Sequence, residues 1–222
     1  MITLIEDDDG LISALQALFK SKNLEAKHFI SGEAYLETVK KETPEIETLE
    51  TMKNLKAGVI LLDVRLPGIS GLETFERQKE IIPYNHEPIV IMTGHGEVDM
   101  AVSALKNGAF DFLTKPVQTD NLLFNIEKAY EKSYELLEMR EFILNFNVRF
   151  EKLTSREAEI AELIALYNPN KSIAEKLGIS VRTIELHRSR IFNKMEVSSA
   201  TEIAAKFEKL AYSKRTFLSK KK

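Results

Sequence analysis

The sequence predicts an α/β domain with a doubly wound, five-stranded parallel sheet, followed by a small all-helical domain. Residues 59–62 form a run of Val, Ile and Leu that ends at Asp63 and is followed by a Pro-Gly turn. Such a run is typical of a strand with helices on both faces of its sheet. Strand-like and helix-like stretches alternate up to about residue 125, whereas only helical spacing continues beyond Phe150.

Five stretches of the first 125 residues have the pattern of buried strands, and helical spacing follows each one. The expected strands cover residues 2–5, 24–30, 59–62, 88–93 and 109–113. The expected helices begin at about Leu11, Gly32, Gly71, Asp99 and Thr119, and the last one is long and runs towards Asn145. Residues 43–56 form a polar insertion with apolar residues three apart, for which we predict an amphipathic helix or extension without assigning it a role.

The composition is that of an ordinary globular protein, with 44% hydrophobic and 29% charged residues among 222. No stretch reaches the roughly 18 to 20 consecutive apolar residues that span a bilayer. The chain starts with a strand-like run and then acids, so we expect no signal peptide. Cysteine is absent, which excludes disulfides and thiolate metal sites and fits a cytoplasmic protein.

The two parts of the chain carry opposite net charges. Residues 151–222 hold 15 Lys and Arg against 9 Asp and Glu, whereas residues 1–150 hold 16 against 25. An excess of basic residues in one domain is typical of nucleic-acid binding. The alternative is a solvated tail, because residues 220–222 are all Lys and supply half of that excess. Charge alone leaves both interpretations open.

Polar side chains stand at the ends of four predicted strands: Glu6 and Asp7, Asp63, Thr93 and Lys115. The carboxyl ends of parallel strands share one edge of the sheet, where open α/β sheets hold their working sites. Carboxylates that lie close together stay ionised when a cation neutralises them, and oxygen ligands without His or Cys suit Mg²⁺. A lysine and a hydroxyl could hold a phosphoryl group there, with an aspartate as nucleophile. For Asp8 and Asp9 we prefer the alternative that strand-end acids only cap helices.

Four motifs surround these residues: LIEDD at 4–8, LDVRLPGISGLE at 62–73, MTGHG at 92–96 and GAFDFLTKP at 108–116. Together they cover the whole predicted sheet, and residues 1–125 resemble the receiver domain of two-component response regulators. The resemblance implies a flavodoxin-like fold for this part of the chain. Glu6 stands where many members of the family have Asp, an exchange that keeps the charge.

The resemblance also implies roles for individual residues. Asp63 would accept a phosphoryl group from a sensor histidine kinase, and Thr93 and Lys115 would contact the phosphoryl oxygens. The implied Mg²⁺ ligands are Asp7, Asp63, the backbone carbonyl of Arg65 and, through a water molecule, Glu6. Phe112 occupies the aromatic switch position that is coupled to Thr93. The Lys115–Pro116 bond matches one that is cis in the family.

Residues 172–185 have the spacing of two helices joined by a Gly-containing turn, which is that of a helix-turn-helix. Ser180 is placed to cap the second helix. The residues of this helix expected to face the core are Val181, Ile184, His187 and Ile191. Leu186 is expected to be partly exposed, where it could contact a thymine methyl group. Helix pairs with this pattern also occur in plain helical cores, so the pattern alone leaves DNA binding open.

Motifs on both sides of this helix pair, LTSREAE at 153–159, KSIA at 171–174, SVRTIELHR at 180–188 and KM at 194–195, resemble the LuxR-type DNA-binding domain. By this resemblance, base edges would be read by Glu185, Leu186 and Ser189. Phosphates would be bound by Lys171, Arg182, Thr183, Arg188 and Lys194. His187 is expected to be a structural histidine bonded within the domain. Residues 167–169 depart from the family, which usually has Gly here, so we predict no conformation for the loop before the helix pair.

Together the two resemblances identify the sequence as a member of the NarL/FixJ response regulators, similar to the FixJ type in residues 93–96. We expect a receiver at residues 1–125, a helical connection at 126–149, a DNA-binding domain at 150–212 and a basic tail at 213–222. Phosphorylation of Asp63 would rearrange Thr93 and Phe112. The face formed by the helix from Asp99, the fifth strand and the helix from Thr119 would then dimerise, and the homodimer would bind double-stranded DNA to regulate transcription.

Two other functions share part of this pattern. Phosphatases of the haloacid dehalogenase type also use an aspartate and Mg²⁺, but they place a second Asp two residues after the nucleophile, where this sequence has Arg65. We therefore expect a transcription regulator rather than an enzyme, with slow self-dephosphorylation. The second alternative is an atypical regulator that binds DNA independently of phosphorylation, against which the intact set of site residues argues.

Overall fold

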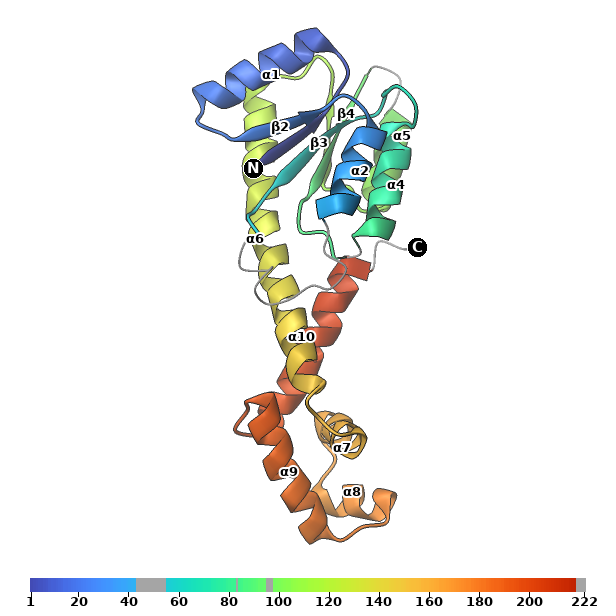
Figure 1. The fold of residues 1–222 in the computed structure, drawn as a ribbon, viewed down its shortest axis with the longest axis vertical. Coiled ribbons are helices and arrows are strands. Elements are labelled where there is room, and N and C mark those ends of the chain that lie inside the picture. The colour runs from blue at the N-terminus through green and yellow to red at the C-terminus, as the bar shows by residue number, and fades with distance from the viewer. Residues whose placement is uncertain (43–54, 83, 95–97, 219–222) are drawn as a thin grey trace. The chain divides into compact units, whose positions relative to one another are not determined.

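The structure, a computed structural model, describes residues 1–42, 55–82, 84–94 and 98–218 (Figure 1). Residues 43–54, most of the insertion for which we predict an amphipathic helix or extension, lie outside the described residues. Residues 95–97, in the loop after Thr93, also lie outside them. The chain divides into two compact units, Met1–Arg140 with Phe217–Lys222 and Glu141–Thr216.

The first unit contains the predicted parallel sheet, with the strand order β2-β1-β3-β4-β5. The strands are β1 (Ile2–Ile5), β2 (Ala26–Phe29), β3 (Val59–Asp63), β4 (Ile89–Thr93) and β5 (Asp111–Thr114). This order confirms the doubly wound, flavodoxin-like topology. Strand β5 begins two residues later than predicted, because Gly108 turns the chain with a φ of +101° and the N–H of Ala109 still bonds to the carbonyl of Ala104.

Helices cover both faces of this sheet (Figure 1). They are α1 (Asp9–Ser21), α2 (Gly32–Glu42), α4 (Gly71–Ile81), α5 (Val98–Lys106) and α6 (Thr119–Phe150). Side chains of α1 and α6, such as Phe19 and Leu122, pack in one half of the core. Side chains of α2, α4 and α5, such as Leu36, Phe75 and Ala104, pack in the other half.

Strand β3 supplies side chains to both halves of the core. Val59 and Leu61 belong to the half with α1 and α6, whereas Ile60 and Leu62 belong to the opposite half, because successive residues of a strand point to opposite faces. All five residues of β3 are buried, as predicted for a strand with helices on both faces. Each buried Val, Leu or Ile contributes on the order of 2 kcal/mol, and this packing fixes the strand end that carries Asp63.

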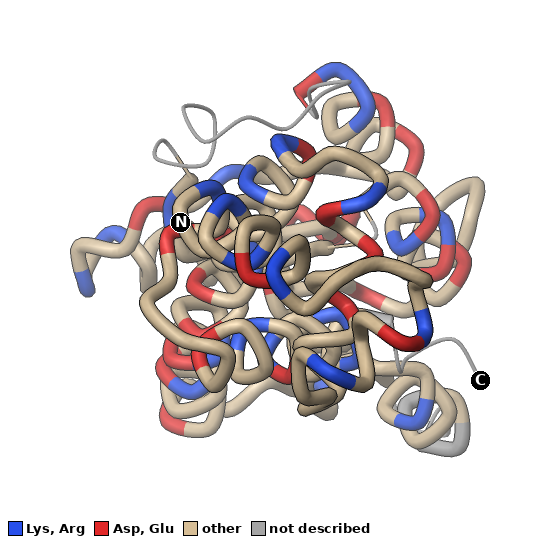
Figure 2. The backbone as a smooth tube through the Cα atoms, turned by 90° about the horizontal axis from the view of Figure 1, so that it is seen from below, with Lys and Arg blue, Asp and Glu red and all other residues tan. Residues whose placement is uncertain are grey.

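The second unit is helical, as predicted. It contains the end of α6 from Glu141, then α7 (Ser155–Ala165), α8 (Asn170–Leu177), α9 (Val181–Met195) and most of α10 (Ala200–Leu218). Their core is formed by buried apolar side chains that include Phe146, Ile160, Ile173, Ile184, Ile191 and Ile203. Basic and acidic positions are interspersed along the backbone (Figure 2). Among the helices of the described residues, none is both long and apolar enough to cross a membrane.

Side-chain caps begin α7 and α9, and a glycine ends α8. A capping box starts α7: the Thr154 hydroxyl accepts from the N–H of Glu157 at 3.2 Å, and the Glu157 carboxylate accepts from the N–H of Thr154 at 2.9 Å. Gly178 ends α8 with a φ of +65°. Ser180 caps α9, as predicted, by accepting from the N–H of Thr183 at 3.1 Å. The turn between α8 and α9 is thereby defined on both sides.

At Val181 the structure differs from the sequence-based prediction, and at Tyr167 it defines a loop that the sequence left undecided. The prediction that Val181 faces the core is wrong, because 42% of the residue is exposed. It is the first residue of α9, where no preceding helical turn packs beside it. Tyr167 takes a φ of +57° between α7 and α8. The chain therefore makes the left-handed turn, for which glycine is the usual residue, with a tyrosine.

His86 is buried between the sheet edge and α6. The Arg140 guanidinium donates to Nδ1 of His86 at 3.0 Å. The Nε2 atom of His86 lies 3.2 Å from the carbonyl oxygen of Lys56. A guanidinium only donates and a carbonyl only accepts, so the ring is neutral with its proton on Nε2. Burial, and then the charge of Arg140, lower the pKa of His86 from 6.5 to about 4.

We predict that His86 makes the protein less stable in mild acid. Between pH 6.5 and about 4 this residue is protonated in the unfolded chain but not in the folded chain. The free energy of unfolding therefore decreases as the pH is lowered through this window, by up to about 3 kcal/mol. Denaturant unfolding at several pH values would measure it. In His86→Gln, whose amide can donate and accept at the same two places, this part of the pH dependence should disappear. Equal slopes for both proteins would contradict the prediction.

Candidate functional site

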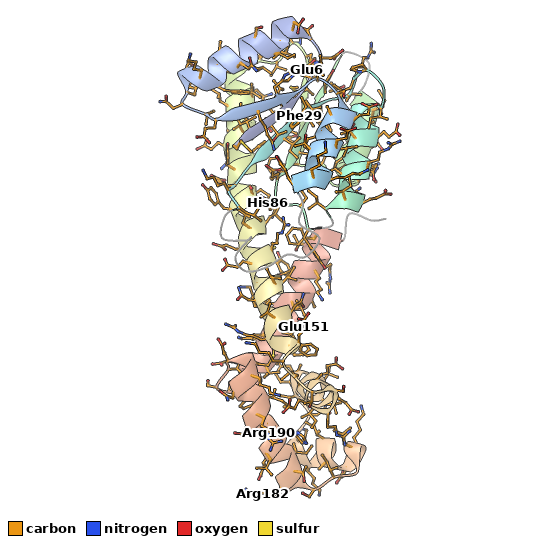
Figure 3. All side chains as sticks on the ribbon, viewed as in Figure 1. Glu6, Phe29, His86, Glu151, Arg182 and Arg190 are labelled. Atoms are coloured by element: carbon orange, nitrogen blue, oxygen red, sulfur yellow. The ribbon has the colours of Figure 1, made fainter. Side chains whose placement is uncertain are left out.

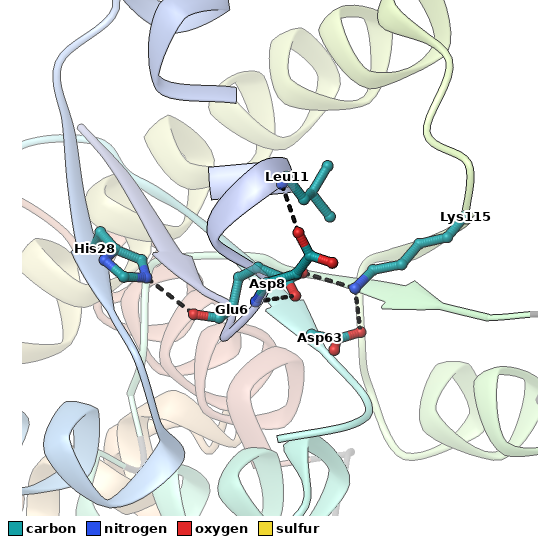
Figure 4. A network of polar contacts seen from close by, with 6 residues as sticks. All are labelled: Glu6, Asp8, Leu11, His28, Asp63 and Lys115. Atoms are coloured by element: carbon teal, nitrogen blue, oxygen red, sulfur yellow. Dashed lines mark hydrogen bonds and ion pairs between the residues drawn. The ribbon is translucent and has the colours of Figure 1, made fainter. Parts of the chain in front are cut away.

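Two buried acids and a lysine meet at the carboxyl edge of the sheet (Figure 4). Lys115, directly after β5, places its Nζ 2.7 Å from Oε2 of Glu6 and 2.9 Å from Oδ1 of Asp63. Glu6 follows β1 and Asp63 ends β3, so three strands bring these groups together. Glu6 and Asp63 are buried, whereas Lys115 is partly exposed. The site is therefore accessible from the side of the lysine.

The electrostatics of this cluster are dominated by burial and by the shared ammonium group. Burial raises the pKa of the Asp63 carboxyl and the Glu6 charge adds to this rise, while the hydrogen bond and charge of Lys115 oppose it. Burial alone would lower the pKa of Lys115, but its bonds to the two carboxylates raise it overall. The lysine is thus charged at neutral pH and is the cation that allows two acids to share a buried site.

Asp7 completes an acidic cluster that is consistent with a divalent metal site. One carboxylate oxygen each from Glu6, Asp7 and Asp63 lies within 4.8 Å of the others. Asp7 is exposed, so the cluster is open to solvent. Carboxylate oxygens are the donors that hard cations such as Mg²⁺ prefer. Arg65, expected to offer its backbone carbonyl, lies two residues beyond β3, and its backbone makes a hydrogen bond to Asp63. The residues present fit a divalent cation.

Thr93 and Phe112 occupy the neighbouring strands β4 and β5. Thr93 is fully buried, and its hydroxyl donates to the carbonyl of Gly94 at 3.3 Å. Its own carbonyl accepts from the N–H of Lys115 at 2.7 Å, which joins the ends of the two strands. Phe112 is partly buried against the core half of α2, α4 and α5. The Lys115–Pro116 bond is cis, as the resemblance implies.

Three residues beside the acids make contacts that the sequence did not reveal. Asp8 caps α1, as expected, and also donates its N–H to Oε1 of Glu6 at 3.2 Å. His28 donates from Nε2 to the carbonyl oxygen of Glu6 at 2.9 Å (Figure 4). This bond satisfies a carbonyl just beyond the end of β1. A Cβ at Gly71 would overlap the carbonyl oxygen of Asp63, so only glycine permits this close approach.

The side chains expected to read bases lie on the open surface of α9. Glu185, Leu186 and Ser189 are all exposed, and 52% of Leu186 is accessible. Arg182 is exposed on the first turn of the same helix, with Nη1 3.4 Å from Glu185 (Figure 3). An exposed apolar side chain among polar and basic ones suits the edge of a base pair in the major groove.

The residues expected to bind phosphates have different surroundings. Lys171 is exposed on the first turn of α8. The Thr183 hydroxyl lies 2.8 Å from that of Ser180 in the cap of α9. Arg188 donates to the amide oxygen of Asn170 at 2.9 Å. This bond joins the start of α8 to the middle of α9. Of these three residues, Lys171 is exposed, whereas Thr183 and Arg188 are partly buried.

The polar atoms of Lys194 and His187 face other residues of the unit or are buried in it. The ammonium group of Lys194 lies 2.6 Å from the carboxylate of the buried Glu157, the residue of the capping box. A phosphate contact would therefore have to be shared with this ion pair. For His187 we expect a hydrogen bond within the domain, but its Nδ1 is buried without a hydrogen-bond partner in the described part of the chain. That expectation is not confirmed for this nitrogen.

Comparison with known families assigns both units. Residues 2–127 match the family of response regulator receiver domains, and residues 151–207 match the luxR family of bacterial regulatory proteins. The chain is a response regulator. The family consists of transcription factors rather than catalytic enzymes. Its receiver implies a histidine kinase as partner, and its helix-turn-helix implies DNA binding.

Relatives of this response regulator resemble it over nearly their full length. The tetrathionate response regulatory protein TtrR of Salmonella typhimurium is 34% identical over 95% of this chain and 93% of its own. The transcriptional regulatory protein FixJ of Bradyrhizobium diazoefficiens is 33% identical over 91% of both chains. The structure of response regulator StyR has a TM-score of 0.69 and 32% identity, covering 94% of this chain and 98% of that one.

We predict that Lys115→Met makes the response regulator less stable without metal and more responsive to Mg²⁺. Without the ammonium group, Glu6 and Asp63 face each other in a buried site, and the pKa of Asp63 rises further. Added Mg²⁺ no longer competes with the lysine, so it should raise the Tm of the variant more than that of the wild type. Thermal unfolding with and without MgCl₂ would measure both effects. Lys128→Met, in an exposed ion pair on α6, is the control and should behave like the wild type.

Proposed function

We propose that Asp63 of this response regulator accepts a phosphoryl group from a sensor histidine kinase and that phosphorylation switches dimerisation and sequence-specific DNA binding. The observation that carries the proposal is the position of Asp63, which ends a central strand, contacts Lys115 at 2.9 Å and lies in an acidic cluster fit for a divalent cation. The two family matches support it, because they join a receiver to a DNA-binding domain in one chain.

The transfer would be a displacement at phosphorus. An ionised carboxylate oxygen of Asp63 attacks the phosphorus atom, while the bond from phosphorus to the kinase histidine nitrogen breaks and leaves its electron pair on that nitrogen. Lys115 provides a fixed positive charge beside the attacked group. Mg²⁺, bound by Asp7, Asp63, the carbonyl of Arg65 and, through water, Glu6, would neutralise charge on the phosphoryl oxygens. These groups also keep Asp63 ionised despite its burial.

Phosphorylation would then reposition the neighbouring strands. The phosphoryl group adds charge and oxygen acceptors next to β4. The Thr93 hydroxyl, now bonded to the Gly94 carbonyl, would donate to one of these oxygens, and Lys115 would bind another. Phe112 would follow inward. Exposed apolar side chains on α5 and α6, Met100 and Phe124 among them, support a homodimer contact on this face.

Dimerisation would present two DNA-binding units to a two-fold site. In each, α9 would enter the major groove with Glu185, Leu186 and Ser189 at the base edges. The phosphate contacts would come from Lys171, Arg182, Thr183, Arg188 and Lys194. The family matches at 2–127 and 151–207 support domain boundaries at 1–125, 126–149, 150–212 and 213–222, and we place the protein in the cytoplasm with its kinase.

We predict that the wild-type protein, incubated with Mg²⁺ and acetyl phosphate, gains the mass of one phosphoryl group, whereas Asp63→Asn gains none. The amide cannot act as the nucleophile, although it fills the same space. Intact-mass spectrometry would measure the adduct. The control is Asp9→Asn, on the first turn of α1 away from the cluster, which should be phosphorylated like the wild type. An adduct on Asp63→Asn would contradict the assignment of the acceptor.

The alternative of DNA binding without phosphorylation has its own readout. A DNA site selected from a random library would be titrated with both forms of the wild-type protein. A phosphorylated form that binds more tightly and as a dimer supports the switch. Equal affinities would favour the phosphorylation-independent regulator.

We predict different effects of two α8 and α9 variants on DNA binding. Lys171→Ala should weaken binding to specific and random DNA alike and reduce the slope of log affinity against log salt by about one, because one phosphate contact is lost. Leu186→Ala should leave the slope unchanged and reduce the preference for the selected site. Fluorescence anisotropy at several salt concentrations would measure both. The control is Lys176→Ala, an exposed lysine on the last turn of α8, for which we expect no change.

A further inference from the structure

Helix α6 continues well beyond the receiver match and stays attached to the receiver. The receiver match ends at residue 127 and the luxR match begins at 151, so residues 128–150 of α6 belong to neither. Within the first unit, α6 reaches Arg140. Its buried positions recur every three or four residues, as one side of a helix requires. They include Leu122, Ile126, Ala129, Ser133, Leu136 and Arg140.

Two of these buried positions are polar, and each one bonds to the residues before a strand. The fully buried hydroxyl of Ser133 accepts from the N–H of Gly58, the residue before β3, at 3.0 Å. Arg140, 6% exposed, donates to Nδ1 of His86, 8% exposed, three residues before β4. His86 in turn donates to the carbonyl of Lys56. We refer to His86, Ser133 and Arg140 as the clamp.

The clamp is position-specific because its groups are buried. A buried guanidinium that loses its acceptor is strongly destabilising, whereas an apolar pair in the same place would tolerate small displacements. Arg140 can donate to His86 only while that ring is neutral, which its burial and the charge of Arg140 favour. The bond from Nε2 to the Lys56 carbonyl fixes the tautomer in which Nδ1 accepts. Movement of α6 along the sheet would break the bond between Ser133 and Gly58 and the bond between Arg140 and His86 at once.

Strands β3 and β4 connect the clamp to the phosphoryl site. Gly58 precedes β3 and Asp63 ends it, while His86 precedes β4 and Thr93 ends it. Glu6 and His86 accordingly lie at opposite ends of the sheet (Figure 3). Rigid secondary-structure elements carry coupling between two sites when they have two arrangements, and β3 and β4 would be such elements here. A shift of β4 that follows a new bond of Thr93 would therefore displace His86.

We propose that the clamp makes the second half of α6 follow the positions of β3 and β4 and so carries the state of Asp63 to the connection with the DNA-binding unit. The signal rests on the proposed phosphorylation of Asp63. The attachment of α6 is independent of it and can be tested separately.

The attachment is tested by hydrogen exchange of full-length protein, followed by mass spectrometry on peptides that cover residues 134–142. His86→Phe and Arg140→Met should each raise exchange in these peptides about tenfold. The double variant should not exceed Arg140→Met by much, because the interaction between His86 and Arg140 is already lost in that variant. His86→Gln keeps a donor and an acceptor and should stay close to the wild type. Unchanged exchange in β1 and β3 peptides would show that the sheet remains folded.

The coupling is tested by the ratio of DNA affinities of the phosphorylated and unphosphorylated forms, with phosphoryl uptake checked by intact mass. We expect His86→Phe and Arg140→Met to take up the phosphoryl group normally and to lose most of this ratio, and His86→Gln to keep it. The clamp would be overturned if the single variants left exchange of the 134–142 peptides unchanged. It would also be overturned if the effects of the two single variants multiplied in the double variant. Faster exchange with a wild-type affinity ratio would overturn the coupling. A wild type that takes up no phosphoryl group would refute the proposed function, while the exchange data would still decide the attachment.

Discussion

The sharing of one ammonium group by two buried carboxylates constrains the rest of the receiver. Glu6 and Asp63 repel each other in a site where burial weakens screening by water, and Lys115 compensates this repulsion only if it reaches both within hydrogen-bond distance. Three strands must therefore end at matching levels, which the parallel register of the sheet provides. The two halves of the apolar core hold these strand ends in place, so packing and charge support the same geometry.

Much of the fold could be predicted because its strands are short, continuous apolar runs with turn residues between them. The run at β3 alone indicates burial on both faces, and the end of strand signals after Phe150 indicates the helical unit. Predictions failed where periodicity carries no information. Val181 has the spacing of a core residue but lies in the first turn of α9, and β5 starts only after the left-handed turn at Gly108.

The positions of the site residues could be predicted for a similar reason, since each one follows directly after a recognisable strand and parallel strands end at one edge. Their roles stay predictions. Contacts between residues far apart in sequence could not be predicted. His28 and Glu6 are 22 residues apart, and His86 and Arg140 are 54 apart. No spacing rule relates such pairs, because the folded chain alone decides that their donors and acceptors meet.

The polar positions within the buried side of α6 also define its register. An entirely apolar stripe could slide by one helical turn and pack almost as well, because leucine and alanine make no directional demands. Ser133 and Arg140 interrupt that stripe seven residues apart, each opposite a fixed partner at the sheet edge. A slip by one turn would bury a guanidinium against carbon. The receiver thereby selects a single alignment of the helix, as isolated polar residues do in coiled coils, and trades some hydrophobic burial for a unique position.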